Sequence, residues 1–196
     1  MSDSANSATP GEITQLIGQW QEGNREAEGA LFSALYDSLH KLAMRVVRSE
    51  RQGQSLGPTA LVHEAYLRLT RAEKIDLSGR SHFLALSARV MRRILVDRAR
   101  ARRAVKRDGV MVSAEWIDLV RTDEDADVIL SVDLAMETLA SDSPEQCQIV
   151  ELRYFAGYSE EQCATILGTS TRTVRRRWQV ARVRLKGLID GTGTPA

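Results

Sequence analysis

The sequence predicts an all-α protein with two small helical domains joined by a linker, the second of which is a helix-turn-helix. Apolar residues recur at helical spacing along most of the chain. Leucine, alanine and arginine are plentiful, whereas only three Phe, four Tyr and three Trp occur, and this composition favours helices over sheets. The length of 196 residues suits one large or two small domains. We predict a tail (1–11), a first domain (12–104), a linker (105–126), a second domain (127–190) and a final tail (191–196).

The first domain is expected to contain four helices. Two amphipathic helices are marked by apolar residues from Ile13 to Trp20 and from Leu31 to Val46. The third runs from about Pro58 to Arg71, because proline suits the first turn of a helix. Its predicted core face comprises Val62, Ala65, Tyr66 and Leu69, and a neighbouring face comprises Ala60, Glu64, Leu67 and Arg71. The fourth runs from near Ser81 to about Arg103, with Phe83, Val90 and Ile94 inward and the arginines outward.

The second domain is expected to begin with a helix near Asp127. The next helix starts at "SDSPEQ", where Ser143 and Gln146 have the spacing of a capping box. Ser159 and Gln162 have the same spacing and open a short helix that ends at Gly168. Thr171 is the predicted N-cap of a long final helix, whose apolar stripe consists of Val174, Trp178, Ala181, Leu185 and Leu188.

A short helix, a tight turn and a second helix with a basic leading end are typical of a helix-turn-helix that reads the major groove. Arginine can pair with guanine, glutamine with adenine, and threonine with a base or a methyl group. The predicted DNA-contacting residues are Thr171, Arg172, Arg175, Arg176 and Gln179. Arg177 and Arg182 are expected to contact phosphates or solvent. The alternative is a surface helix that carries more arginines than it needs.

The formal net charge of +1 conceals strong segregation of charge. Residues 89–107 hold nine bases and one acid, residues 115–127 six acids and one base, and residues 171–186 seven bases and no acid. Basic faces without acidic partners repel themselves unless something binds them. The pattern therefore predicts two surfaces for a polyanion, with solvated helix faces as the alternative.

Several function classes are disfavoured. No apolar run is long enough to span a bilayer, and the N-terminus lacks the pattern of a secretory signal, so a cytoplasmic location is expected. Cys147 and Cys163 lack metal-ligand spacing and are expected to be reduced and buried. The segment "HEAYL" from His63 has Leu67 where a zinc-binding motif needs a second histidine. We predict no enzymatic activity, no metal and no cofactor.

Two motifs in this order resemble the extracytoplasmic-function (ECF) sigma factors. "QIVELRYFAGYSEEQCATILGTSTRTVRRRWQVARVRL" is similar to the fourth conserved region of sigma factors, and "TALVHEAYLRL" followed by "HFLALSARVMRRILVDRARARRA" is similar to the second. The resemblance covers about residues 12–190. It implies that the chain binds core RNA polymerase and directs it to promoter DNA to initiate transcription.

The resemblance also implies roles for particular residues. The helix that grips the polymerase clamp would present Ala60, Glu64, Leu67 and Arg71. Phosphate affinity would come from Arg92, Arg93, Arg98, Arg100, Arg102 and Arg103. The loop from Glu73 to His82 matches the place where the family captures a flipped base, for which Arg80, Ser81, His82 and Phe83 are candidates. A core position is the stronger interpretation of Phe83.

The chain departs from the family at the start of the clamp-binding helix. Most members carry a cluster of acids there, whereas residues 57–60 read Gly-Pro-Thr-Ala. Some sigma factors with this departure resemble ones controlled by a Ser/Thr protein kinase. A phosphate on Thr59 would restore negative charge at a helix N-terminus. The alternative is that Thr59 is an ordinary helix residue and Glu64 suffices. Whether an anti-sigma factor also binds is left open.

Two other functions compete with this interpretation. A conventional helix-turn-helix regulator would bind DNA without polymerase, commonly at a symmetric site. A protein that only sequesters polymerase would support no transcription. Footprinting with and without polymerase distinguishes the first alternative, and run-off transcription distinguishes the second.

Overall fold

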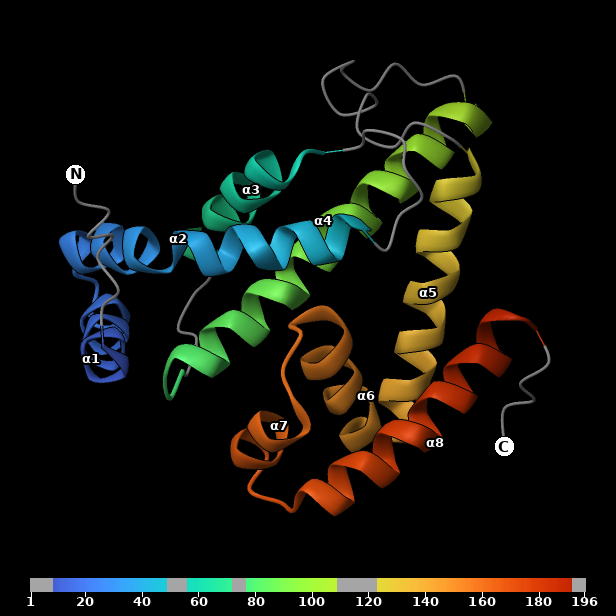
Figure 1. Ribbon diagram of the computed structural model, residues 1–196. Helices are drawn as coiled ribbons and strands as arrows, with labels where there is room; N and C mark the ends of the chain where they lie inside the picture. The colour runs from blue at the N-terminus through green and yellow to red at the C-terminus, as the bar shows by residue number, and fades with distance from the viewer. Residues whose placement is uncertain (1–8, 49–55, 72–76, 109–122, 192–196) are drawn as a thin grey trace, which may run out of the picture.

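The computed structural model describes residues 9–48, 56–71, 77–108 and 123–191, and every regular element in these ranges is helical (Figure 1). The all-α fold class is thereby confirmed. The elements are α1 (Pro10–Gln21), α2 (Arg25–Arg48), α3 (Pro58–Arg71), α4 (Arg80–Asp108), α5 (Asp123–Asp142), α6 (Pro144–Val150), the π-helix η2 (Glu151–Phe155), α7 (Glu160–Ile166) and α8 (Thr171–Ile189). We call α1–α4 the N-terminal unit and α5–α8 the C-terminal unit.

Two helices begin at capping boxes. The Ser159 hydroxyl accepts from the Gln162 N–H and the Gln162 side chain accepts from the Ser159 N–H, as predicted for the start of α7. The same reciprocal pair joins Thr9 and Glu12 before α1. The sequence analysis missed this second box. It starts α1 at Pro10, inside the segment predicted as a tail.

Other predicted boundaries need correction. Ser143 makes no side-chain cap hydrogen bond, so its predicted capping box is wrong, and its Oγ accepts from Arg184 instead. Ser170, not Thr171, is the N-cap of α8. Both α4 and α5 enter the segment 105–126 that was predicted as a linker. A turn expected near Trp116 lies outside the described residues.

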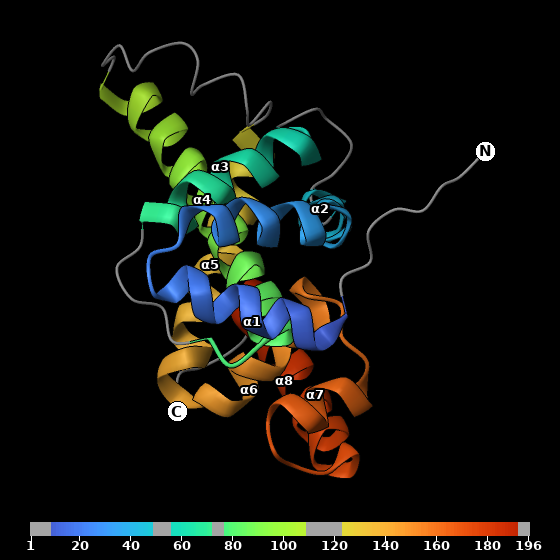
Figure 2. The same ribbon diagram turned by 90° about the vertical axis from the view of Figure 1, so that its left-hand side faces the viewer.

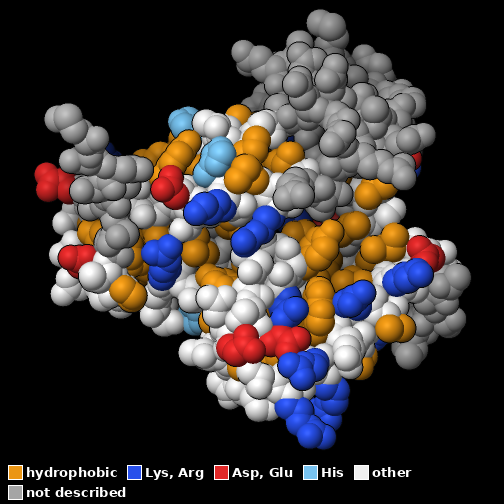
Figure 3. All heavy atoms as spheres, in the orientation of Figure 1, with side chains coloured by type: hydrophobic (Ala, Val, Ile, Leu, Met, Phe, Trp, Pro, Cys, Tyr) orange, Lys and Arg blue, Asp and Glu red, His pale blue; other side chains and the backbone are white. Residues whose placement is uncertain are grey.

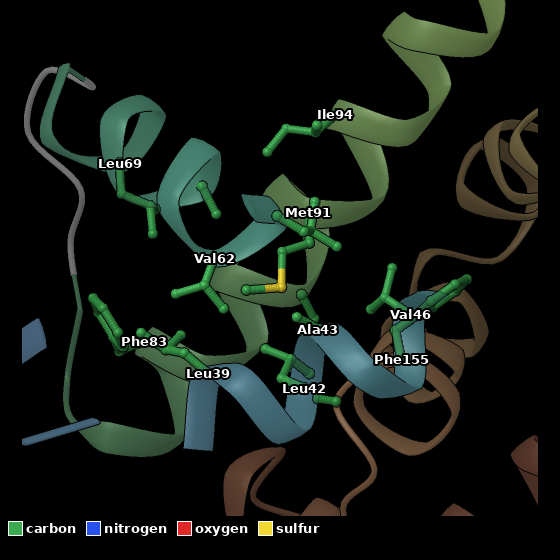
Figure 4. Close-up of a cluster of buried hydrophobic side chains, with 14 of the residues drawn as sticks. Leu39, Leu42, Ala43, Val46, Val62, Leu69, Phe83, Met91, Ile94 and Phe155 are labelled. Carbon is green, nitrogen blue, oxygen red and sulfur yellow. The ribbon is translucent and has the colours of Figure 1, made fainter. Parts of the chain in front are cut away.

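The core of the N-terminal unit forms where α2, α3 and α4 meet (Figure 4). Phe83 at the start of α4 is fully buried, and its ring lies edge-on to Trp20 and Phe32 with centroids 5.9 and 5.4 Å away. In Figure 2, α2 crosses α4 partway along its length, and α1 packs against both. Aliphatic side chains from three helices complete this core: Leu39, Leu42, Val62, Leu69, Met91 and Ile94.

The two units share one continuous apolar cluster. Val46 of α2 faces Phe155 of η2 (Figure 4), and the cluster extends to Met136 of α5. The helix α5 also runs along the C-terminal half of α4 (Figure 1). The C-terminal unit therefore packs directly against the N-terminal unit in this structure.

A π-helical turn orients the chain at this contact. The N–H of Ala156 donates to the carbonyl of Glu151 at 2.9 Å, five residues earlier, and Gly157 then takes a positive φ of 74°. The positive φ favours glycine at this position, and a Cβ there would also displace the guanidinium of Arg45, whose Nη1 would lie about 2.0 Å away. The prediction that this helical stretch ends at Gly157 is confirmed.

Candidate DNA and polymerase interfaces

The leading end of α8 carries the side chains predicted to contact DNA. Arg172, Arg175, Arg176 and Gln179 are exposed, and Thr171 is half-buried. Figure 3 shows Lys and Arg side chains gathered at the lower edge of the molecule, near the start of α8. Of these residues, Arg175 pairs with Glu160 of α7 at 2.9 Å. The structure thus brings the predicted set together on one accessible face.

The orientation of α8 is fixed by a cap at its N-terminus and by packing along its buried side. The Ser170 hydroxyl accepts from the Thr173 N–H at 3.2 Å, which stabilises the start of the helix. Val174 is fully buried against α6, η2 and α7, and the guanidinium of Arg153 lies over the Trp178 ring, 5.3 Å from its centroid. Packing of this kind holds the exposed face of a helix at a defined angle to its neighbours.

The two cysteines lie in these apolar clusters, as predicted. Cys163 is fully buried between α7 and α8, and burial raises the pKa of its thiol to about 11. Burial also raises the pKa of Cys147. Both thiols are free and stay protonated near neutral pH, which makes them poor nucleophiles.

The predicted polymerase-binding stripe runs along the outer side of α3. Ala60 and Arg71 are exposed, whereas Glu64 and Leu67 are half-buried. Glu64 pairs with Arg68 at 3.5 Å, and Arg68 also pairs with Asp97 of α4 at 2.6 Å. The first turn of α3 contains no acid.

Thr59 lies exposed at this acid-free first turn. Its Oγ1 is 3.5 Å from Nε2 of His40 on α2. It borders a surface hollow of about 810 Å³ that is also lined by Tyr36, Tyr66 and Arg80. The hydroxyl is therefore accessible, and there is space beside it for a bulkier group.

The arginines of α4 are placed differently from the prediction that all point outward. Arg98 is 7% exposed, and burial lowers its pKa. Arg92 pairs with Asp133 of α5 at 2.6 Å, and Arg93 pairs with Asp97 at 3.2 Å. The side chain of Arg102 lies outside the described residues. The outward assignment is wrong for Arg98, whose charge faces the interior of the N-terminal unit.

The candidates for base capture lie in different surroundings, although Arg80 and Ser81 line one surface hollow. Phe83 is fully buried, so its core position is confirmed. His82 is exposed and lies 2.6 Å from the Ser78 hydroxyl, whereas Arg80 donates to Ser38 on α2. Part of the loop from Glu73 to His82 lies outside the described residues.

Two acids at the contact between the units were missed. Asp133 of α5 and Glu151 of η2 are 3% and 8% exposed, and both pair with arginines of α4. A signal was present for Asp133, which is an acid one turn before Met136 on the otherwise apolar side of its helix. No sequence signal marks Glu151, because the direction of its side chain depends on the π-helical turn.

Within the described ranges, no helix is long and apolar enough to cross a bilayer. The same part of the chain contains no group of three or more His, Cys, Asp or Glu side chains placed to hold a metal ion.

The family model for ECF sigma factors matches residues 10–190, from the start of α1 to the end of α8. No curated protein matches the chain.

Proposed function

The chain belongs to the ECF sigma factor family, and on that premise we propose that α8 reads the upstream promoter element, α3 docks on the polymerase clamp and α4 supplies affinity for the downstream element. Sigma factors of this family bind core RNA polymerase to initiate transcription. The observation that carries the assignment of α8 is its exposed basic leading face, with Val174 on the opposite side packed against α6, η2 and α7. A helix-turn-helix would present its second helix to DNA in this way.

Reconstituted run-off transcription tests this proposal. Core polymerase with this protein should produce a transcript from a matched promoter, and neither component alone should do so. Footprinting should show protection of two dissimilar elements only when polymerase is present. Protection of a symmetric site by the protein alone would instead identify a conventional helix-turn-helix regulator, and polymerase binding without a transcript would identify a sequestering protein.

Docking through α3 is proposed to depend on phosphorylation of Thr59 by a Ser/Thr protein kinase. The first turn of α3 lacks the acids that would face a basic clamp, and Thr59 is exposed there. Phosphorylation adds nearly two negative charges at the positive end of the helix dipole. The phosphate oxygens could then accept hydrogen bonds from clamp arginines.

A pull-down of core polymerase with unmodified and phosphorylated protein tests this switch. The phosphorylated form should bind more tightly, and Thr59→Ala should abolish the gain in the presence of the kinase. Thr70→Ala, at the other end of α3, is the matched control and should retain it. Equal affinity of both forms would show that Glu64 and its neighbours suffice without the phosphate.

A further inference from the structure

Two histidines lie beside the hydroxyl of Thr59. The Nε2 of His40 on α2 is 3.5 Å from Oγ1 of Thr59. His63 follows Thr59 by four residues on α3, and both line the same surface hollow of about 810 Å³. Figure 3 shows histidine side chains close together near α3. The whole chain contains three histidines, so most of them are gathered at one hydroxyl.

The spacing on α3 brings His63 to the same side of the helix as Thr59. Residues four apart on a helix are neighbours, with Cβ atoms about 5–6 Å apart. His63 is exposed, and the centroid of its ring lies 6.4 Å from that of Tyr66. A group attached to Oγ1 of Thr59 is therefore within reach of two imidazoles, one from α2 and one from α3.

The ring of His40 is held in place from its own helix. It is half-buried and stacks on Tyr36, one turn earlier on α2, with ring centroids 6.1 Å apart and an angle of 24° between the planes. A side chain that is already restrained loses less conformational entropy when it binds a ligand. His40 is thus better prepared than a freely rotating surface histidine to hold an anion at Thr59.

The other polar and charged groups of the hollow come from α2, α3 and α4. Asp37 of α2 and Arg80 of α4 both line it, and Nη2 of Arg80 donates to the hydroxyl of Ser38 at 2.7 Å. The hydroxyl of Tyr66 on α3 donates to Glu28 of α2 at 2.8 Å. Because Asp37 and Arg80 have opposite charges, their effects on an anion oppose each other. The two imidazoles then decide how well the anion is held.

An imidazole is well suited to bind a phosphate monoester. The phosphate takes its second negative charge at about pH 6, and an unperturbed imidazole gains its positive charge at about pH 6.5. At about pH 6 the two therefore have opposite charges, and each stabilises the ionised form of the other. The hydrogen bonds between them are charge-assisted, which makes them stronger than those between neutral groups.

We propose that His40 and His63 form a cradle for a phosphate on Oγ1 of Thr59, in which both imidazoles donate hydrogen bonds to the phosphate oxygens. The proposal rests on the phosphorylation of Thr59 put forward above and adds the residues of this chain that position the phosphate. Because the cradle includes His40, the phosphate lies in the hollow between α2 and α3 rather than beyond the end of α3. The negative site is then formed by two helices instead of one.

Phosphorus NMR on the full chain tests the cradle. Phosphothreonine is incorporated at position 59 during protein synthesis, so no kinase is needed. The phosphorus chemical shift gives the pH midpoint of the second ionisation of the phosphate. This midpoint is compared between the unsubstituted phosphoprotein, His40→Gln and His63→Gln. His82→Gln is the matched control, because His82 is exposed on α4 and is not among the residues that line the hollow.

Each cradle variant should raise the midpoint by roughly 0.2–0.7 pH unit, the effect expected of an exposed ion pair, because loss of an imidazolium destabilises the phosphate dianion. His82→Gln should leave the midpoint unchanged. His40→Lys restores a positive charge and should bring the midpoint back down. An unchanged midpoint in either His40→Gln or His63→Gln would overturn the cradle.

A second measurement needs no variant, so it decides the question where a variant fails to fold. At one pH, the ring resonances of His40 and His63 should differ between the phosphorylated and the unmodified protein, and those of His82 should coincide. Unmoved resonances of His40 or of His63 would overturn the cradle equally.

Affinity for polymerase enters neither measurement, so the cradle and the switch fail separately. Equal affinity of the phosphorylated and unmodified forms for core polymerase would refute the switch and leave the raised midpoints in place. An unchanged midpoint together with tighter binding of the phosphorylated form would refute the cradle and leave the switch.

Discussion

Replacing Phe83 with leucine tests whether this ring belongs to the core or to a base-binding pocket. The ring is fully buried and lies edge-on to Trp20 and Phe32. Each such aromatic pair contributes about 0.5–1.5 kcal/mol beyond area burial. Loss of ring volume adds a cavity term because a packed core relaxes only partly. We expect Phe83→Leu to lower the free energy of unfolding by about 2–3 kcal/mol.

Urea unfolding followed by circular dichroism measures this loss. The neighbouring His82 is exposed, so His82→Ala should change the free energy of unfolding by less than about 0.5 kcal/mol. A loss below about 0.5 kcal/mol for Phe83→Leu, together with loss of promoter melting, would refute the core assignment. Phe83 would then have to leave the core and contact a base.

Three further predictions concern the C-terminal unit. Burial raises the pKa of Cys163 to about 11 from an ordinary 9.0, so the thiol of the unfolded chain ionises first as pH rises. The free energy of unfolding should therefore fall between about pH 9 and about pH 11. Urea titrations at several pH values measure this fall, and Cys163→Ala should remove it. Ser159→Ala removes the cap of α7 and should cost about 1 kcal/mol in urea unfolding, whereas Ser131→Ala on the exposed side of α5 should cost less. Arg172→Ala should weaken binding of holoenzyme to its promoter by about 1–3 kcal/mol in a gel-shift titration while leaving the pull-down of core polymerase unchanged. An equal loss of core binding would contradict the assignment of Arg172 to DNA.

Local sequence rules were sufficient where local contacts decide the structure. The bounds of α3 were predicted from proline at its start and its apolar spacing, and the cap at Ser159 from its distance to Gln162. Both features depend on residues within a few positions of one another. The same holds for the stripe on α8, where Val174 and Ala181 are buried as expected.

The failures arose where distant residues compete. Ser143 has the sequence of a capping box, but Arg184, 41 positions away, takes its hydroxyl as an acceptor. Arg98 belongs to a basic run that suggests a solvated face, yet its side chain is buried. Asp133 and Glu151 pair with arginines only because α4 and the C-terminal unit pack together, and no spacing rule in one sequence predicts that packing.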